Sequence, residues 1–207
     1  MLLYYGVILV AILALFFQAN VTSTFGKYSK IRSSRGYTGA DVARMLLSQN
    51  GITDVSVQPI RGNLTDHYNP VNKTLNLSES VYNSTSVAAL GVAAHETGHA
   101  VQHARMYAPL KMRSALVPVV NFSSSIMTWV LLGGILLFNS FPQLLWIGII
   151  LFATTTLFSF ITLPVEINAS KRALVWLSSS GITNSYNHTQ AEDALRSAAY
   201  TYVVAAL

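Results

Sequence analysis

The sequence predicts a mainly α-helical membrane protein with a small α+β unit between its first two apolar segments. Two observations indicate this class. Of the 207 residues, 52% are hydrophobic and only 10% are charged, whereas soluble domains average about 25% charged residues. The apolar residues also gather in long uncharged runs. We therefore expect about three transmembrane helices, with a candidate for a fourth at the C-terminus.

The first apolar run covers residues 2–17 and extends to about Val21 without a charge. A helix needs ~20 apolar residues to cross a bilayer. A cleaved signal peptide is the alternative, but no Lys or Arg precedes the run and no small-residue cleavage pattern follows it. We therefore predict an uncleaved transmembrane anchor over residues 1–21.

A polar stretch over residues 22–115 has the pattern of a small α+β unit. A capping box that begins at Thr38 predicts a helix, and Gly51 is a typical stop signal for it. Alternation of apolar and polar residues predicts short strands at residues 55–57, 64–68 and 75–77, the last two of which are expected to pair.

Residues 116–163 are predicted to form an antiparallel transmembrane hairpin. Its second half, residues 144–163, is uncharged, while its first half, residues 116–138, is apolar but interrupted by Pro118. The short link of residues 139–142 requires the two helices to run antiparallel. A buried hairpin of a soluble protein is the alternative, but the polar remainder of the chain is too small to enclose both helices.

The C-terminal segment, residues 164–207, begins polar and regains helical character from residue 191. It becomes apolar from Ala198 onward. This part is expected to form either a core helix or the start of a further span.

The basic residues predict how the chain is oriented. Those beside the apolar segments are Lys27, Lys30, Arg32, Arg35, Lys111, Arg113, Lys171 and Arg172. By the positive-inside rule, the N-terminus and the hairpin tip face outward and the polar unit faces the cytoplasm. We thus expect a multi-pass protein of the cell membrane with the lipid bilayer as partner. The net charge of +5 does not gather into a basic patch interleaved with aromatic residues, so no nucleic-acid partner is expected.

A long helix is expected to begin at Ser84 or Thr85 and to run to about Met106. Most of its positions are apolar, yet its centre holds His95-Glu96-Thr97-Gly98-His99. Polar groups on an otherwise apolar helix are costly to bury without a partner, so their presence indicates a bound ligand. Gly98 in mid-helix suggests close packing or room for that ligand.

His95 and His99 lie one helical turn apart, so both imidazoles can reach one metal ion. The chain has no cysteine, which leaves histidine and carboxylate as the strong zinc ligands. Glu96 is close enough to act as a general base, taking a proton from a zinc-activated water and passing it to a leaving amine. The pattern predicts a zinc hydrolase.

A catalytic zinc of this kind needs a third protein ligand. Three histidines are candidates: His67, His103 and His188. We favour Glu166, because a carboxylate at the membrane end of an apolar helix is costly unless it is paired or metal-bound. The alternative is a surface pair between Glu166 and Lys171 or Arg172.

The segment from His95 to Gln102, the two-span insertion and the segment Leu163–Ser170 together resemble the YugP-type neutral zinc metallopeptidases. Residues 66–70 resemble that family too, and the match covers nearly the whole chain in order. The layout is similar to the CAAX prenyl proteases and the HtpX-type membrane proteases. The resemblance implies a zincin-like catalytic unit with Glu166 as third ligand, one Zn²⁺ per chain, and an endopeptidase that cleaves membrane proteins or peptides near the membrane.

The chain departs from the wider pattern at one point. Related enzymes often have an aspartate soon after the third ligand, where this chain has the neutral Asn168 and Ser170. Either can accept a hydrogen bond from an imidazole N–H, but with less charge to raise the basicity of the ligand. We therefore expect the zinc to be held less tightly.

A hydrolase of this kind also needs a donor that stabilises the oxyanion of the transition state. The candidates are His67, Tyr68, Tyr107 and His188, with His67 favoured because a polar strand ahead of the zinc helix commonly lines the cleft. A non-catalytic zinc-binding membrane scaffold or chaperone-like protein is the alternative function, but it would not need Glu96. A transporter is disfavoured, because the predicted spans carry no ionisable side chain in their middle.

Overall fold

The computed structural model describes residues 2–33, 35–183 and 185–205, and the side chains of part of both terminal helices lie outside the described set. Within this part the chain is mostly helical with one three-stranded sheet. The elements in order are α1 (Leu2–Tyr28), α2 (Gly39–Gln49), β1 (Ser56–Ile60), β2 (His67–Asn69), β3 (Thr74–Ser78), α3 (Glu79–Tyr82), α4 (Val87–Ala104), α5 (Ala108–Leu136), α6 (Gln143–Ser179) and α7 (Ser185–Ala205).

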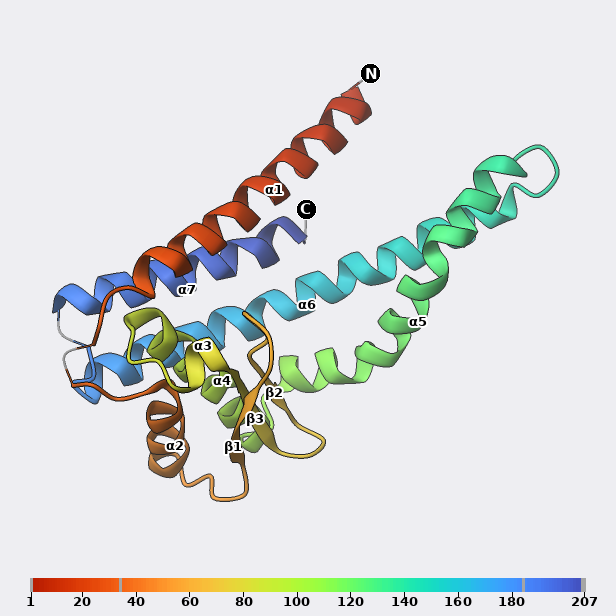
Figure 1. The fold of residues 1–207 in the computed structure, drawn as a ribbon. Coiled ribbons are helices and arrows are strands. Elements are labelled where there is room, and N and C mark those ends of the chain that lie inside the picture. Colours follow the sequence, from red (N-terminus) through yellow and green to blue (C-terminus); the bar gives the residue numbers. More distant parts are fainter. Residues whose placement is uncertain (1, 34, 184, 206–207) are drawn as a thin grey trace.

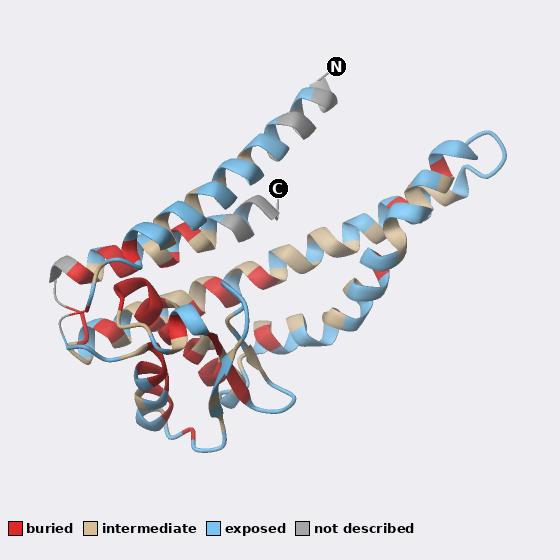
Figure 2. Cartoon of the chain, viewed as in Figure 1, coloured by how far each residue is buried: buried red, intermediate tan, exposed pale blue. Residues whose placement is uncertain are grey.

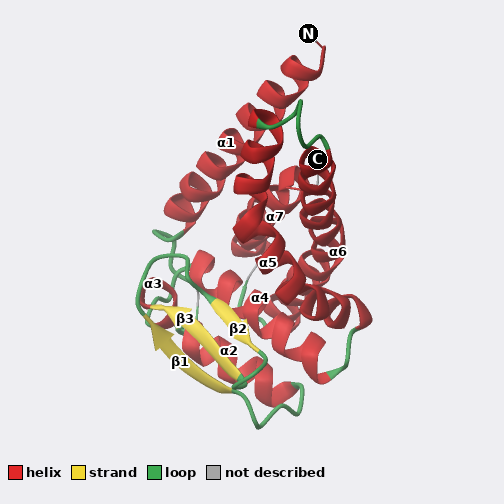
Figure 3. Cartoon of the chain, turned by 90° about the vertical axis from the view of Figure 1, so that its right-hand side faces the viewer, coloured by secondary structure: helices red, strands yellow, loops and turns green. Residues whose placement is uncertain are grey.

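Helices α1, α5, α6 and α7 project from a globular unit (Figure 1). Helices α5 and α6 form an antiparallel hairpin, and α1 lies beside α7. The sheet and helices α2 to α4 gather at the opposite end from the N-terminus and the hairpin tip, which the second view also shows (Figures 1 and 3). The arrangement thus separates an apolar, elongated part from a polar, compact one.

The hairpin has the properties of a membrane-spanning pair. Helices α5 and α6 are long and apolar enough to cross a bilayer, and only 6% of the most apolar window of each is buried inside the protein. Figure 2 shows their surfaces as mainly exposed or intermediate. The low burial rules out the alternative of an enclosed core hairpin.

Helix α1 is continuous from Leu2 to Tyr28 and exposes Leu9, Leu15 and Phe16. Part of the predicted anchor over residues 1–21, and of the predicted apolar end after Ala198, falls on side chains outside the described residues. Their membrane insertion therefore stays a prediction.

Helix α6 continues through Pro164 to Ser179 instead of ending where the apolar run does. An internal proline removes one backbone hydrogen bond from a helix. Packing compensates here, because Val165, Ala169 and Ala173 beyond the proline are fully buried. Helix α6, a candidate membrane span, therefore also enters the globular unit.

The sheet has the order β1-β3-β2, with β1 parallel and β2 antiparallel to β3. The antiparallel pairing confirms the predicted one, with Tyr68 opposite Leu75. The parallel pair was not expected from the sequence. Leu75 and Leu77 of the central strand are fully buried against Ala89 and Ala93 of α4. Strand β2 lies at one edge of the sheet and contacts α4.

Helix α4 begins later than expected, because Ser86 and not Ser84 or Thr85 is its N-cap. The Ser86 side chain accepts from the backbone N–H of Ala89, 3.2 Å away. Ser84 instead supports the cap, since its hydroxyl donates to Ser86 Oγ at 3.0 Å. The expected capping box of α2 at Thr38 and Asp41 is present.

Helix α4 is the centre of the globular core. One of its faces packs on α2, α6 and α7 through residues that include Leu46, Leu90 and Leu177. Its other face packs on the sheet. A β-carbon on Gly98 would lie 3.0 Å from the carbonyl oxygen of Ala169 and 3.1 Å from its Cα, so α4 and α6 approach closely where they cross at Gly98. Of the two interpretations of Gly98, close packing is the one found.

The Gly98→Ala variant is expected to lose about 1–2 kcal/mol of stability, because overpacking at Ala169 outweighs the better helix propensity of alanine. Gly91→Ala in the same helix is the matched control, since its β-carbon would meet only Leu195 Cγ at 3.8 Å. Thermal unfolding in detergent should place the Gly98→Ala midpoint about 2–8 °C below the native protein and the control at or above it. Equal midpoints for the two variants would contradict the close contact.

Candidate metal centre

Helix α4 places His95 and His99 with their rings 4.8 Å apart between centroids and nearly perpendicular. Their Nε2 atoms are 3.2 Å apart. Glu166 comes from α6, and its Oε2 lies 3.1 Å from His95 Nε2 and 3.4 Å from His99 Nε2. Two distant parts of the chain thus bring three donor atoms together.

These separations match those of a tetrahedral zinc site. Ligands at about 2.0–2.1 Å around a tetrahedral ion lie about 3.3 Å from one another. The donor set is also suitable, because neutral imidazole and carboxylate are common zinc ligands. The residues present therefore fit a zinc ion.

Burial of the three side chains strengthens this fit. The Glu166 side chain is 4% exposed, and those of His95 and His99 are 15% and 12% exposed. A carboxylate at this depth is costly unless a cation compensates it. Neither Lys171 nor Arg172 supplies that cation: Lys171 is exposed, and Arg172 donates to Asn168.

Each imidazole is oriented by a hydrogen bond at its other nitrogen. His95 Nδ1 lies 3.0 Å from Ser170 Oγ, and His99 Nδ1 lies 3.0 Å from Gln102 Oε1. If both Nδ1 atoms carry the proton, both Nε2 atoms are free to bind a metal. Ser170 thus has the expected position as an acceptor for an imidazole.

Gln102 orients His99 and was not expected from the sequence to do so. It is fully buried, and its Nε2 donates to Val165 O at 2.8 Å and Asn168 Oδ1 at 3.1 Å. Asn168 therefore supports His99 through Gln102 and not directly. The available signal was a polar residue three positions after His99, on the same helix face.

Glu96 lies beside the three donors but is engaged differently. Its Oε2 accepts the backbone N–H of Tyr68 at 3.1 Å, on the free edge of β2. A carboxylate oxygen of Glu96 also lies within 4.8 Å of the histidine nitrogens. Burial raises the pKa of Glu96 above its ordinary value, while the nearby His99 and His95 act in the opposite direction. A raised pKa suits a carboxylate that must hold a proton during a reaction.

The remaining histidines lie elsewhere. His103 contacts the Tyr68 hydroxyl at 2.8 Å, and His188 on α7 contacts Thr183 at 3.2 Å. His67 is exposed, with Nδ1 2.8 Å from Thr65 O and Nε2 3.2 Å from Asn76 Nδ2. The structure therefore brings Glu166, and none of these three, to His95 and His99.

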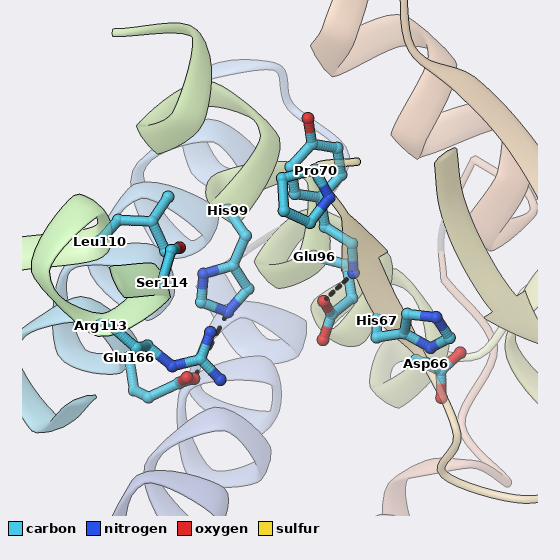
Figure 4. Close-up of a pocket in the computed structure, with 10 residues that line it drawn as sticks. Asp66, His67, Pro70, Glu96, His99, Leu110, Arg113, Ser114 and Glu166 are labelled. Carbon is cyan, nitrogen blue, oxygen red and sulfur yellow. Dashed lines mark hydrogen bonds and ion pairs between the residues drawn. The ribbon is translucent and has the colours of Figure 1, made fainter. Parts of the chain in front are cut away.

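A cavity of about 150 Å³ opens beside the donor atoms. Figure 4 shows it between α4, α5 and β2. Its lining consists of Asp66, His67, Tyr68, Pro70, Glu96, His99, Leu110, Arg113, Ser114 and Glu166. A second cavity of about 270 Å³ reaches Glu96 and Glu166 and is walled by Gln18 and Val21 of α1 and Leu195 of α7. The site is thus accessible from two directions.

A family model described as "Putative neutral zinc metallopeptidase" matches residues 3–207. A curated relative, "Putative membrane protease YugP" from Bacillus subtilis (strain 168), is 47% identical over 190 residues, which are 92% of this chain and 84% of the relative. No solved structure gives a significant match.

Zinc affinity is expected to depend on pH through His99. Burial opposes protonation of His99, but the hydrogen bond to Glu166 and the charges of Glu96 and Glu166 outweigh it and raise the pKa of His99 to about 9. Below that pH zinc must displace a proton, so its affinity should rise about tenfold per pH unit up to about 9. Chelator competition at several pH values measures this. An affinity that levels off near pH 6.5, as for an ordinary histidine, would be evidence against it.

The Ser170→Asp variant is expected to bind zinc about tenfold more tightly, because a charged acceptor at His95 Nδ1 raises the basicity of the ligand. Ser170→Ala should bind it more weakly. Ser178→Asp adds the same charge at an exposed position of α6 and serves as control. Metal titration of the four proteins tests the contact. Equal gains for both aspartate variants would mean that only the net charge matters.

Proposed function

The chain belongs to the neutral zinc metallopeptidases, and on this basis we propose that it is a membrane-embedded zinc endopeptidase that cleaves membrane proteins or peptides near the membrane. The observation that carries the proposal is the set of donor separations, 3.1 to 3.4 Å, among His95, His99 and Glu166. One Zn²⁺ held there would act as a Lewis acid and lower the pKa of a coordinated water.

Glu96 is proposed as the general base. Its Oε2 is fixed by the N–H of Tyr68, which leaves Oε1 to accept a proton from the attacking water. The water oxygen then bonds to the carbonyl carbon of the substrate. When the C–N bond breaks, Glu96 passes the proton to the leaving nitrogen, so the carboxylate is regenerated.

Strand β2 supports this role of Glu96. Antiparallel pairing with β3 fixes the backbone at Tyr68, and the Tyr68 hydroxyl is held by His103 of α4 at 2.8 Å. Glu96 is therefore oriented by a rigid backbone donor and not by a flexible side chain. A scaffold that only bound zinc would have no use for this contact, which disfavours the non-catalytic alternative.

Membrane-proximal substrates are favoured by the place of the site. Helix α6 carries Glu166 and is a candidate span, and the second cavity is walled by α1 and α7. The ends of α1, α5 and α6 that carry Lys27, Lys111 and Lys171 all adjoin the globular unit (Figure 1). The positive-inside rule then supports a multi-pass topology in the cell membrane with the site on the cytoplasmic side.

Glu96→Gln is expected to lower kcat for peptide hydrolysis by about 10²–10⁴-fold, the usual contribution of a general base. Zinc content should stay at one per chain, because Glu96 is not among the three ligands. Glu192→Gln makes the same change at an exposed position and should keep native activity. Purified protein in detergent, assayed on fluorogenic peptides with and without a chelator, provides the measurement. Hydrolysis that survives both Glu96→Gln and the chelator would refute the proposed function.

A further inference from the structure

The cavity beside the candidate metal centre is lined by one arginine, Arg113, which is not among the proposed metal ligands. Arg113 lies in the second turn of α5 and shares the cavity with Glu96, His99 and Glu166. Figure 4 shows its guanidinium extending from α5 toward His99 and Glu166. Its side chain keeps a positive charge, as arginine does in proteins.

The Arg113 side chain packs against α6 and keeps one hydrogen-bond donor without a partner among the described residues. Its Nε is buried with no partner, and among the described residues Arg113 forms no ion pair. The guanidinium lies over the ring of Phe158 on α6, with Arg113 Cζ 5.9 Å from the ring centroid. Burying the Nε donor unpaired is costly. A bound ligand that accepts a hydrogen bond from the guanidinium would offset this free-energy cost.

Other donors in the cavity are already engaged. The backbone N–H of Tyr68 donates to Glu96, and the Tyr68 hydroxyl is paired with His103. Both ring nitrogens of His67 have partners in or beside β2. Among the lining residues this leaves Arg113 and the neutral hydroxyl of Ser114. The favoured oxyanion candidate, His67, is thus less suitable than a residue that the sequence did not single out.

We propose that Arg113 is a catalytic residue that binds the carbonyl oxygen of the scissile peptide as that oxygen becomes an oxyanion. This rests on the proposed peptidase function. When the water oxygen bonds to the carbonyl carbon, the π electron pair moves onto the carbonyl oxygen, and the guanidinium N–H groups donate to it. When the C–N bond breaks, the electron pair returns and re-forms the C=O bond. A charge-assisted hydrogen bond strengthens as the oxygen gains charge, so the contact favours the transition state over the substrate.

The position of Arg113 also links the membrane hairpin to the chemistry. Leu110, one turn earlier on α5, is 8% exposed and lines the same cavity. Phe158 belongs to the apolar part of α6. The packing of the two hairpin helices therefore positions the Arg113 guanidinium. The candidate metal ligands are positioned by α4 and by the part of α6 beyond Pro164.

The test uses the full-length protein in detergent and two sets of fluorogenic peptides, one C-terminally amidated and one with a free C-terminal carboxylate. Arg113→Met removes the charge at similar length, and Arg113→Lys keeps the charge without the planar guanidinium. Lys111→Met is the matched control, because Lys111 is an exposed cation on the same helix and outside this cavity. Arg113→Met should lower kcat by about 10²–10³-fold with little change in KM. Arg113→Lys should recover part of that loss, and Lys111→Met should behave as the native protein.

Zinc content and circular dichroism are measured on each variant and are expected to be unchanged. Native kcat in Arg113→Met would overturn the inference. Loss of zinc would also overturn it, since Arg113 would then support the metal site. A loss confined to KM, and only for peptides with a free C-terminal carboxylate, would identify a carboxylate-binding residue instead. If the native protein is no faster than Glu96→Gln, the proposed function itself fails and this inference with it.

Discussion

The contact between α4 and α6 is the constraint on which the rest of the structure depends. His95 and His99 can converge on one ion by helix geometry alone, but the third donor is about 70 residues away in the sequence. Because Gly98 has no side chain, α4 can pack closely against Ala169 of α6. This packing brings Glu166 Oε2 within 3.1 to 3.4 Å of the Nε2 atoms of both imidazoles. Gln102 reinforces the same contact by joining His99 to the backbone of α6.

This constraint connects the candidate metal centre to the apolar hairpin. Because α6 passes through Pro164 without ending, one rigid element carries both the apolar surface and Glu166. Helix α5 follows α4 directly and packs along α6, so the hairpin forms one wall of the cavity while β2 forms the other (Figure 4). The proposed membrane peptidase would therefore need no separate domain to bring its site to the bilayer surface.

The parts that the sequence predicts well are those encoded locally. Helical periodicity places His95, Glu96 and His99 together, and the capping box predicts the start of α2. Glu166 was expected as the third ligand for two reasons. An unpaired carboxylate at the end of an apolar helix is costly, and the segment around it resembles a known family. Gln102 and Arg113 were not, because their roles arise from contacts with α6 and with the cavity that no local pattern encodes. The parallel pairing of β1 with β3 is likewise a long-range contact.

X-ray absorption spectroscopy at the zinc edge tests the central claim, one ion bound by His95, His99 and Glu166, most directly. The zinc-loaded protein should show only nitrogen and oxygen neighbours at about 2.0–2.2 Å, with the outer-shell scattering of two imidazoles. Glu166→Gln should lose the bound zinc or exchange one protein oxygen for solvent, while His103→Ala should leave the spectrum unchanged. A spectrum that needs three imidazoles, or one unaltered in Glu166→Gln, would contradict this ligand set.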